Sequence, residues 1–200
     1  KSDIDNLKYR VDLLIPKLGP LGLGAEQIAG VSPLSGPTCT LLYPNQPDFL
    51  LQTAWPNAWE SMSTFVDALM AFLDYQPDAG SNTIVVSPKL PTAWTTMTFN
   101  NIALKTHRVS LTVTETANAQ SALFTNNTGA SVNAAATLKL PPGRAPCSVT
   151  INGAPTPYTF DSATGRISIS AHALATGAAA TTEFRVQHLA GSSPDYNQSG

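Results

Sequence analysis

The sequence predicts an α+β protein in which a short helical segment precedes an antiparallel β-sandwich. Apolar residues recur with the 3.6-residue period of a helix in parts of residues 1–78, whereas after residue 80 they alternate with a period of two. Turn residues interrupt this second part at close intervals, as is typical of sandwiches. We therefore predict a helical segment over 1–78, a sandwich domain over 79–190 and a flexible tail over 191–200.

The first predicted helix follows directly after the N-terminal residues. Ser2, with Asp5 three residues later, is a weak start signal, and Pro16 stops the helix. Its apolar face consists of Ile4, Leu7, Val11 and Leu14. From residue 19 to residue 56 glycine and proline recur too often for a regular element, so we expect a long ordered loop, which in a compact domain is usually functional.

The second predicted helix begins at Asn57, which forms a capping box with Glu60. Pro77, Asp78 and Gly80 are its stop signals. The residues that follow the helical period are Met62, Phe65, Val66, Leu69, Phe72 and Leu73. Most of the remaining positions are apolar too, and such a helix needs neighbours on several sides. Because the rest of the chain offers too few, we expect residues 1–78 to be the end of a larger helical assembly.

Nine short segments with alternating or β-branched residues predict the strands of the sandwich. They are residues 83–86, 97–99, 109–114, 122–124, 136–140, 149–151, 158–160, 166–170 and 183–186. Turn residues separate them, and Asn152-Gly153 between apolar runs predicts a two-residue hairpin.

Composition narrows the classes of partner. The chain has 11 Lys and Arg against 13 Asp and Glu, a net charge of −2, and 12% charged residues. No basic patch points to nucleic acid or an anionic membrane, and no apolar run reaches the roughly 18–20 residues of a membrane span. The low charge and many Thr, Ser, Ala and Asn are typical of exported proteins, so we expect a secreted or periplasmic location and a neutral polar partner. A signal peptide is not recognisable at the start, so either one has been removed or the chain belongs to a longer protein.

Two cysteines, Cys39 and Cys147, lie far apart in the sequence. They form either one disulfide between the loop and the sandwich or two buried free thiols. The histidines His107, His172 and His188 are isolated, with no metal-ligand spacing, and we expect neither a metal nor a cofactor. Residues 126–128 and 197–199 match the N-glycosylation acceptor pattern, which matters in a eukaryotic source.

Three segments in this order resemble a known enzyme group. Residues 22–27 (Gly-Leu-Gly-Ala-Glu-Gln) resemble the Gly-Leu-x-x-Glu-Gln loop of glucoamylase-type glycoside hydrolases, the family 15 type of six-hairpin enzyme with an (α/α)6 barrel. Residues 54–62 look like the entry to the last barrel helix, although Trp59 is followed by Glu60-Ser61 rather than by the usual histidine pattern. Residues 88–94 are similar to the linker that opens a C-terminal β domain.

The resemblance implies that residues 1–78 are the terminal part of an (α/α)6 barrel and that Glu26 is the general base of an inverting glycosidase. Gln27 would orient Glu26 or bind a sugar hydroxyl. The general acid would come from an earlier barrel helix in the upstream remainder of the enzyme or in a second chain, so this chain alone is expected to be inactive. Without the resemblance, the sequence favours Glu26 as a solvated loop acid or an N-terminal helix charge.

Tyr43, Trp55 and Trp59 are candidates for a sugar-binding platform, because aromatic faces suit the apolar face of a pyranose. The sequence predicts equally that Trp59 packs in the helix core and that Trp55 fills space between packed elements. Trp94 is expected to pack between helices and sandwich. The sequence therefore favours the C-terminal part of a carbohydrate-active enzyme acting on an oligo- or polysaccharide. The alternative is a non-catalytic β-sandwich module for glycan binding or structural support.

Overall fold

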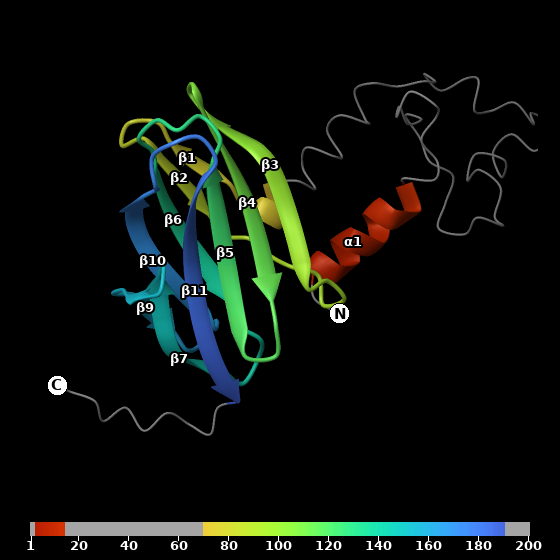
Figure 1. Cartoon of the computed structure of the whole chain (residues 1–200). Helices are drawn as coiled ribbons and strands as arrows, with labels where there is room; N and C mark the ends of the chain where they lie inside the picture. Colours follow the sequence, from red (N-terminus) through yellow and green to blue (C-terminus); the bar gives the residue numbers. More distant parts are fainter. Residues whose placement is uncertain (1–2, 15–69, 191–200) are drawn as a thin grey trace, which may run out of the picture. The chain divides into compact units, whose positions relative to one another are not determined.

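A computed structural model describes residues 3–14 and 70–190, and the chain divides into two compact units, residues 1–70 and 71–200 (Figure 1). In the first unit, helix α1 (Asp3–Leu14) confirms the first predicted helix. Asp3 and Asp5 lie in its first turn, where negative charge complements the helix dipole. Lys8 and Asp12 form an ion pair one turn apart. Among the described helices, none has the length and apolar character that crossing a membrane requires.

The second unit consists of two β-sheets. The five-stranded sheet has the order β1-β2-β6-β10-β9, and the six-stranded sheet has the order β3-β4-β5-β11-β7-β8. The strands of the first sheet are β1 (Gln76–Asp78), β2 (Thr83–Val86), β6 (Asn133–Lys139), β10 (Arg166–Ala173) and β9 (Thr159–Asp161). Those of the second are β3 (Thr96–Leu104), β4 (His107–Glu115), β5 (Ala119–Asn126), β11 (Ala180–Ala190), β7 (Arg144–Ile151) and β8 (Ala154–Pro155).

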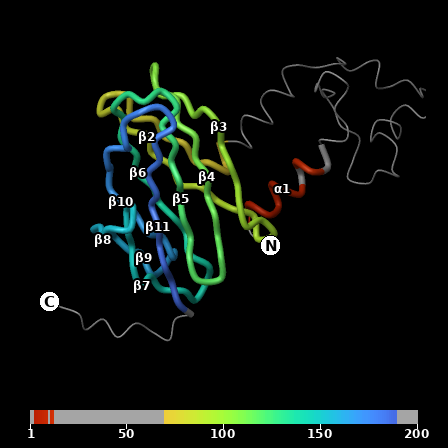
Figure 2. Tube along the Cα trace, viewed as in Figure 1, coloured from red at the N-terminus to blue at the C-terminus, as the bar shows by residue number. Residues whose placement is uncertain are grey.

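The two sheets form the layers of a sandwich, and Figure 2 shows the front layer of β3, β4, β5 and β11 over the layer of β2, β6 and β10. Along β4, β5 and β6 buried residues alternate with more exposed ones, as the period of two predicts. The largest fully buried apolar side chains come from both sheets: Phe124, Phe184, Ile84, Leu111, Leu138 and Ile167. All nine predicted strands are confirmed, and β1 and β8 are additional.

The predicted α+β class is wrong. Within the described ranges, eleven strands accompany one complete helix, α1, and one helical turn at residues 70–73, so the chain has a mainly β, sandwich-like fold. Helices from the end of a barrel are not part of what the structure describes. The prediction of a purely antiparallel sandwich also needs correction, because β2 pairs with β6 in parallel while the other pairs are antiparallel.

Local backbone features explain how the strands connect. Ile151 pairs with Ala154 across Asn152 and Gly153, both of which have positive φ angles (50° and 81°). This confirms the predicted two-residue hairpin, whose favoured turn requires φ above zero at both positions. In β3 the pairing with β4 shifts between Phe99 and Ile102, where Asn101 has φ 57°. This bulge keeps the buried residues on both sides of it facing the core.

Of the second predicted helix, only residues 70–73 are described, and the helical turn they form ends before the stop signals that the sequence predicted. Residues 70–73 are helical, and Asp74, with φ 48°, takes the left-handed conformation that commonly terminates helices. Pro77 and Asp78 belong to strand β1 instead. Phe72 and Leu73 are buried, with 8% and 6% of their surfaces exposed, so this last turn belongs to the core of the sandwich unit.

Candidate functional site

The predicted catalytic and sugar-binding residues lie outside the described residues. This applies to Glu26, Gln27, Tyr43, Trp55 and Trp59, all within residues 15–69. Their roles stay predictions. The functional geometry that the structure does describe belongs to residues 70–190, where three features stand out: a helix junction, two aspartate turns and a buried polar cluster.

The junction joins the end of the second helix to the linker that precedes β3. The amide of Lys89 donates to the carbonyl oxygen of Phe72 over 2.8 Å, and the amide of Ser87 donates to that of Leu73 over 3.1 Å. The rings of Phe72 and Trp94 stack with centroids 5.7 Å apart and planes inclined by 25°. Lys89 also forms an ion pair with Asp74 over 3.2 Å. Trp94 therefore packs at this junction, as the sequence predicted.

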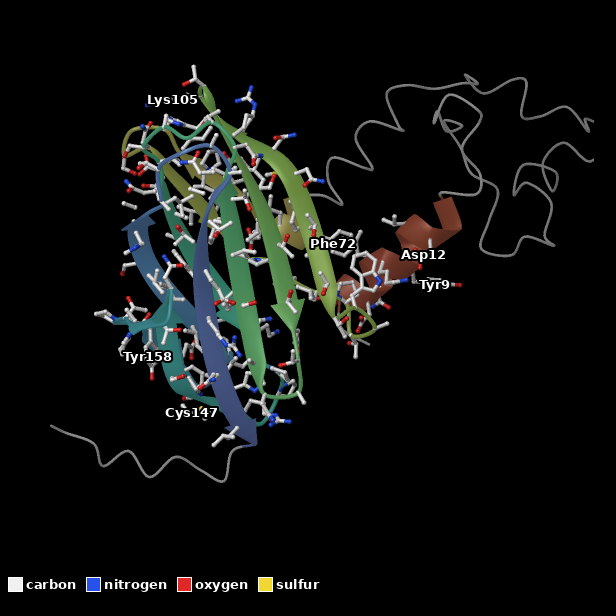
Figure 3. All side chains as sticks on the ribbon, in the orientation of Figure 1. Tyr9, Asp12, Phe72, Lys105, Cys147 and Tyr158 are labelled. Carbon is white, nitrogen blue, oxygen red and sulfur yellow. The ribbon has the colours of Figure 1, made fainter. Side chains whose placement is uncertain are left out.

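These contacts satisfy groups that a helix end normally leaves unpaired. The last four carbonyl groups of a helix have no partner within it, and a cap, water or tertiary contact must supply one. Here the linker of the sandwich supplies two donors, for Phe72 and Leu73. Figure 3 shows Phe72 among the side chains of this region. The helix end is thus held by hydrogen bonds, an aromatic stack and an ion pair, all from the sandwich unit.

Two exposed aspartates organise turns in the same way. In Asp78, Oδ1 accepts from the amides of Gly80 and Ser81, and Oδ2 accepts from the Ser81 hydroxyl at 2.6 Å. In Asp161, Oδ1 accepts from the amides of Ala163 and Thr164, and Oδ2 accepts from the Thr164 hydroxyl at 2.6 Å. These bonds, the hydroxyl bonds foremost, hold the pKa of each carboxyl below its ordinary value. Both residues are therefore ionised turn-formers and unsuited to donate a proton.

A polar cluster lies inside the sandwich at the end of the six-stranded sheet where Figure 3 labels Cys147; Lys105 marks the opposite end. His188 is fully buried, and neither of its ring nitrogens has a partner among the described residues. Gln120, 3% exposed, donates through Nε2 to Glu115 over 3.4 Å, while its Oε1 has no partner in the described part.

The strand register explains why these side chains gather. Gln120 lies opposite Glu115 on β4 and opposite Val186 on β11, and His188 follows two residues after Val186 on the same face. Burial raises the pKa of Glu115, and the hydrogen bond from Gln120 opposes that shift. Burial lowers the pKa of His188, and the positive charge of Arg144 lowers it further. This end of the sheet thus holds a buried imidazole on β11 whose protonation is disfavoured and, two strands away on β4, a half-buried carboxyl.

Sequence reasoning missed this cluster, although a signal was present. The residues that face the core are Gln120, Ala122 and Phe124 in β5 and Phe184, Val186 and His188 in β11. A polar residue at an apolar phase of a strand marks either a satisfied network or a functional group. The spacing of the three histidines in the sequence bears on metal binding, but it does not reveal which of them is buried.

At the opposite end, His107 is also buried. Lys105 donates to Asn82 Oδ1 over 3.1 Å, which turns the Asn82 amide nitrogen toward His107 Nε2 at 3.3 Å. Nε2 therefore accepts, and the ring proton lies on Nδ1, which has no partner among the described residues. His172 is exposed and meets Phe184 edge-on at 6.2 Å. No group of three metal-ligating side chains occurs in the described part of the chain.

The acceptor pattern at Asn126 is structurally occupied. Asn126 is fully buried, its Nδ2 donates to the carbonyls of Ala130 (2.8 Å) and Ala175 (3.2 Å), and its Oδ1 accepts from the amide of Gly129 (2.9 Å). An amide nitrogen in this position is inaccessible to glycosylation in the folded protein. Cys147 is free and exposed, so in this structure it forms neither the disulfide of the first alternative nor the buried thiol of the second. Cys39 lies outside the described residues.

Comparison with models of known families gives no match, and comparison with curated proteins gives none either. Among solved structures, the chain is similar to a variant of the Flavobacterium johnsoniae GH31 dextranase complexed with isomaltotriose, with a TM-score of 0.37 and 8% identity. The match covers 52% of this chain and 16% of the dextranase chain. This weak neighbour is a glycoside hydrolase, but of a different family from the glucoamylase type that the sequence motifs resemble.

Proposed function

We propose that residues 71–190 form a non-catalytic β-sandwich module that supports the helix preceding it. The observation that carries this proposal is the junction: Phe72 and Leu73 are buried in the sandwich unit, and their carbonyl groups receive hydrogen bonds from Lys89 and Ser87. These bonds fix the helical residues Phe72 and Leu73 against the linker of the sandwich. Structural support is one form of the alternative that the sequence left open.

The carboxylates of the sandwich unit favour a non-catalytic role. Glycoside hydrolysis requires two carboxyl groups on either side of the scissile bond. Four of the five carboxylates in residues 71–190 hold the fold: Asp78 and Asp161 form turns, Asp74 pairs with Lys89, and Glu115 is bonded by Gln120. The fifth, Glu183 on β11, is a single carboxyl and does not by itself supply the pair that this reaction requires.

The test is a substitution at the junction in the full chain. Trp94→Ala removes the stack on Phe72, so we expect amide hydrogen exchange to accelerate at residues 71–75 while the core strands keep their protection. Tyr158→Ala is a matched control, because Tyr158 is a comparably exposed aromatic (38%, against 36% for Trp94) far along the chain from the junction. Unchanged protection of residues 71–75 in Trp94→Ala would refute the supporting role.

A second candidate rests on the three ordered sequence segments. In that proposal the sandwich follows the catalytic part of a secreted or periplasmic glycoside hydrolase, and Glu26 activates water at the anomeric carbon of an oligosaccharide. Gln27, Tyr43, Trp55 and Trp59 would bind the sugar, and the upstream remainder of the enzyme or a second chain would supply the acid. In the complete enzyme, Glu26→Gln should abolish turnover and retain sugar binding, whereas turnover near that of the unmodified enzyme rejects Glu26 as the base.

A further inference from the structure

His188 lies where an ionised side chain is least tolerated. His188 lies on the inward face of β11, in line with Phe184 and Val186, and none of these three residues has exposed surface. Nδ1 and Nε2 both lack hydrogen-bond partners in the described part of the molecule. A neutral ring already leaves one donor and one acceptor unpaired, and a protonated ring would leave two donors and a buried charge.

The groups around His188 offer little compensation for such a charge. On β7, the register places Pro146 opposite His188, and Arg144, two residues before it, contributes a positive charge that repels a protonated imidazole. On β4, Glu115 lies across Gln120, and its Oε2 already accepts from that amide.

The facing sheet contributes apolar groups at this end. In the turn from β6 to β7 the amide of Arg144 donates to the carbonyl oxygen of Pro141, and the amide of Leu140 donates to the carbonyl oxygen of Gly165, just before β10. The buried side chains that these strand ends carry are Leu138, Leu140 and Ile167. Lys139 and Arg166 on the same strands are exposed. Among the charges of the described residues, that of Arg144 acts on His188, and its positive sign disfavours a protonated imidazole.

The hydrogen-bond ladder between β11 and β7 is interrupted beside His188. The pairing of β11 with β7 shifts between Gln187 and His188, where Cys147 has no opposite partner. On the other side, the amide of His188 donates to the carbonyl oxygen of Asn118 in the turn before β5. A bulge of this kind is a place where local opening separates a strand end without unfolding the sheet.

We propose that His188 is an acid-sensitive lock: as a neutral ring it keeps this end of the sandwich closed, and when it gains a proton, residues 118–120, 144–148 and 186–189 open together. This inference goes beyond the supporting role of the module. The direction of the pH dependence follows from which of the two states binds the proton more readily. Because the closed state disfavours the proton, the open state binds more protons, and the equilibrium shifts toward opening as the pH falls. One proton linked to opening raises the opening constant by up to tenfold per pH unit below the ordinary histidine pKa of about 6.5.

The experiment is hydrogen exchange of the full chain, read by mass spectrometry from pH 7.5 to pH 5.0 and corrected for the intrinsic exchange rate at each pH. We expect the opening constant of the three segments to rise as the pH falls below about 6.5, approaching tenfold per unit, while the centre of β4 and β6 stays protected. His188→Gln should remove this pH dependence, and His172→Gln, at the exposed histidine, should retain it. A slope that persists in His188→Gln, or its absence in the unmodified chain, overturns the proposal.

Arg144→Met keeps the experiment decisive if His188→Gln does not fold. Without the repelling guanidinium, His188 gains a proton more easily in the closed state, so the pH dependence of opening should weaken. An unchanged or steeper dependence in Arg144→Met contradicts the arrangement described here.

Discussion

Replacing Asn126 by alanine tests how one buried amide stabilises the loops at one end of the sandwich. The substitution removes two bonds from Nδ2, to the carbonyls of Ala130 and Ala175, and two bonds to Oδ1, from the Gly129 amide and from the Thr128 hydroxyl at 3.4 Å. A neutral hydrogen bond contributes about 0.5–1.5 kcal/mol net, and a buried group left unpaired costs about 1–3 kcal/mol. Since three backbone groups lose their partner together, we expect the free energy of unfolding to fall by about 2–4 kcal/mol. Such a loss is a large part of the roughly 5–15 kcal/mol typical of a domain.

The assay is urea unfolding of the full chain, followed by circular dichroism at neutral pH. Asn127→Ala is the matched control, because Asn127 is exposed and its amide bonds the side chains of Asn101 and Ser110 at the surface. We expect that control to lose less than about 1 kcal/mol. A loss below about 1 kcal/mol in Asn126→Ala would show that the loops hold their shape without this amide.

Two further predictions concern a glycine and an aspartate. Gly129→Ala should destabilise the sandwich strongly in thermal unfolding, because φ is +73° and a Cβ would lie 2.9 Å from the amide nitrogen of Ala178. Gly143→Ala is the control: φ is +74° and nothing lies within 4 Å of the added Cβ, so only the backbone strain remains. Equal melting temperatures of the two variants would contradict this. Asp161 has a lowered pKa in the folded state, so its contribution to stability is present above the unfolded pKa of about 3.9 and disappears as the pH falls through the folded value. Asp161→Asn should therefore flatten the decline of stability with acid below about pH 4, and an unchanged acid-unfolding curve would exclude that contribution.

The sheet strands were predictable where side chains alternate. Residues 109–114 lie within β4, where one face is buried, and residues 83–86, all β-branched, were predicted with the bounds of β2. Strand β1 escaped prediction because all three of its residues are exposed and the middle one is Pro77. Strand β8 has two exposed residues and exists through its pairing with β7. A strand without a buried face has no period to recognise.

The direction of β2 and the class of the fold were not predictable in the same way. Side-chain pattern does not encode whether a neighbour runs parallel, and β2 pairs in parallel with β6, which follows it by more than forty residues in the chain. The α+β prediction took the apolar helix as evidence of a barrel, on the argument that this chain could not cover it. For Phe72 the covering side chain comes from the same chain, the linker residue Trp94, whereas residues 57–69 of that predicted helix lie outside the described residues.

The candidate site also has parts that follow from local sequence and parts that depend on contacts between distant segments. The aspartate turns follow local sequence, since Asp78 and Asp161 bond residues two and three positions later. The polar cluster depends on register: Glu115 and Gln120 are near in sequence, but His188 joins them through the pairing of β5 with β11. Such a meeting of distant segments has no signature in the sequence of one chain.

The most direct test of the supporting role is a double-mutant cycle on Phe72 and Trp94 in the full chain, using Phe72→Ala, Trp94→Ala and the double variant in urea unfolding. If the sandwich holds the helix end through their stacked rings, the two substitutions will be non-additive by about 0.5–1.5 kcal/mol. Additive losses would mean that the helix end and the linker are stabilised independently, and the proposed supporting role would be contradicted.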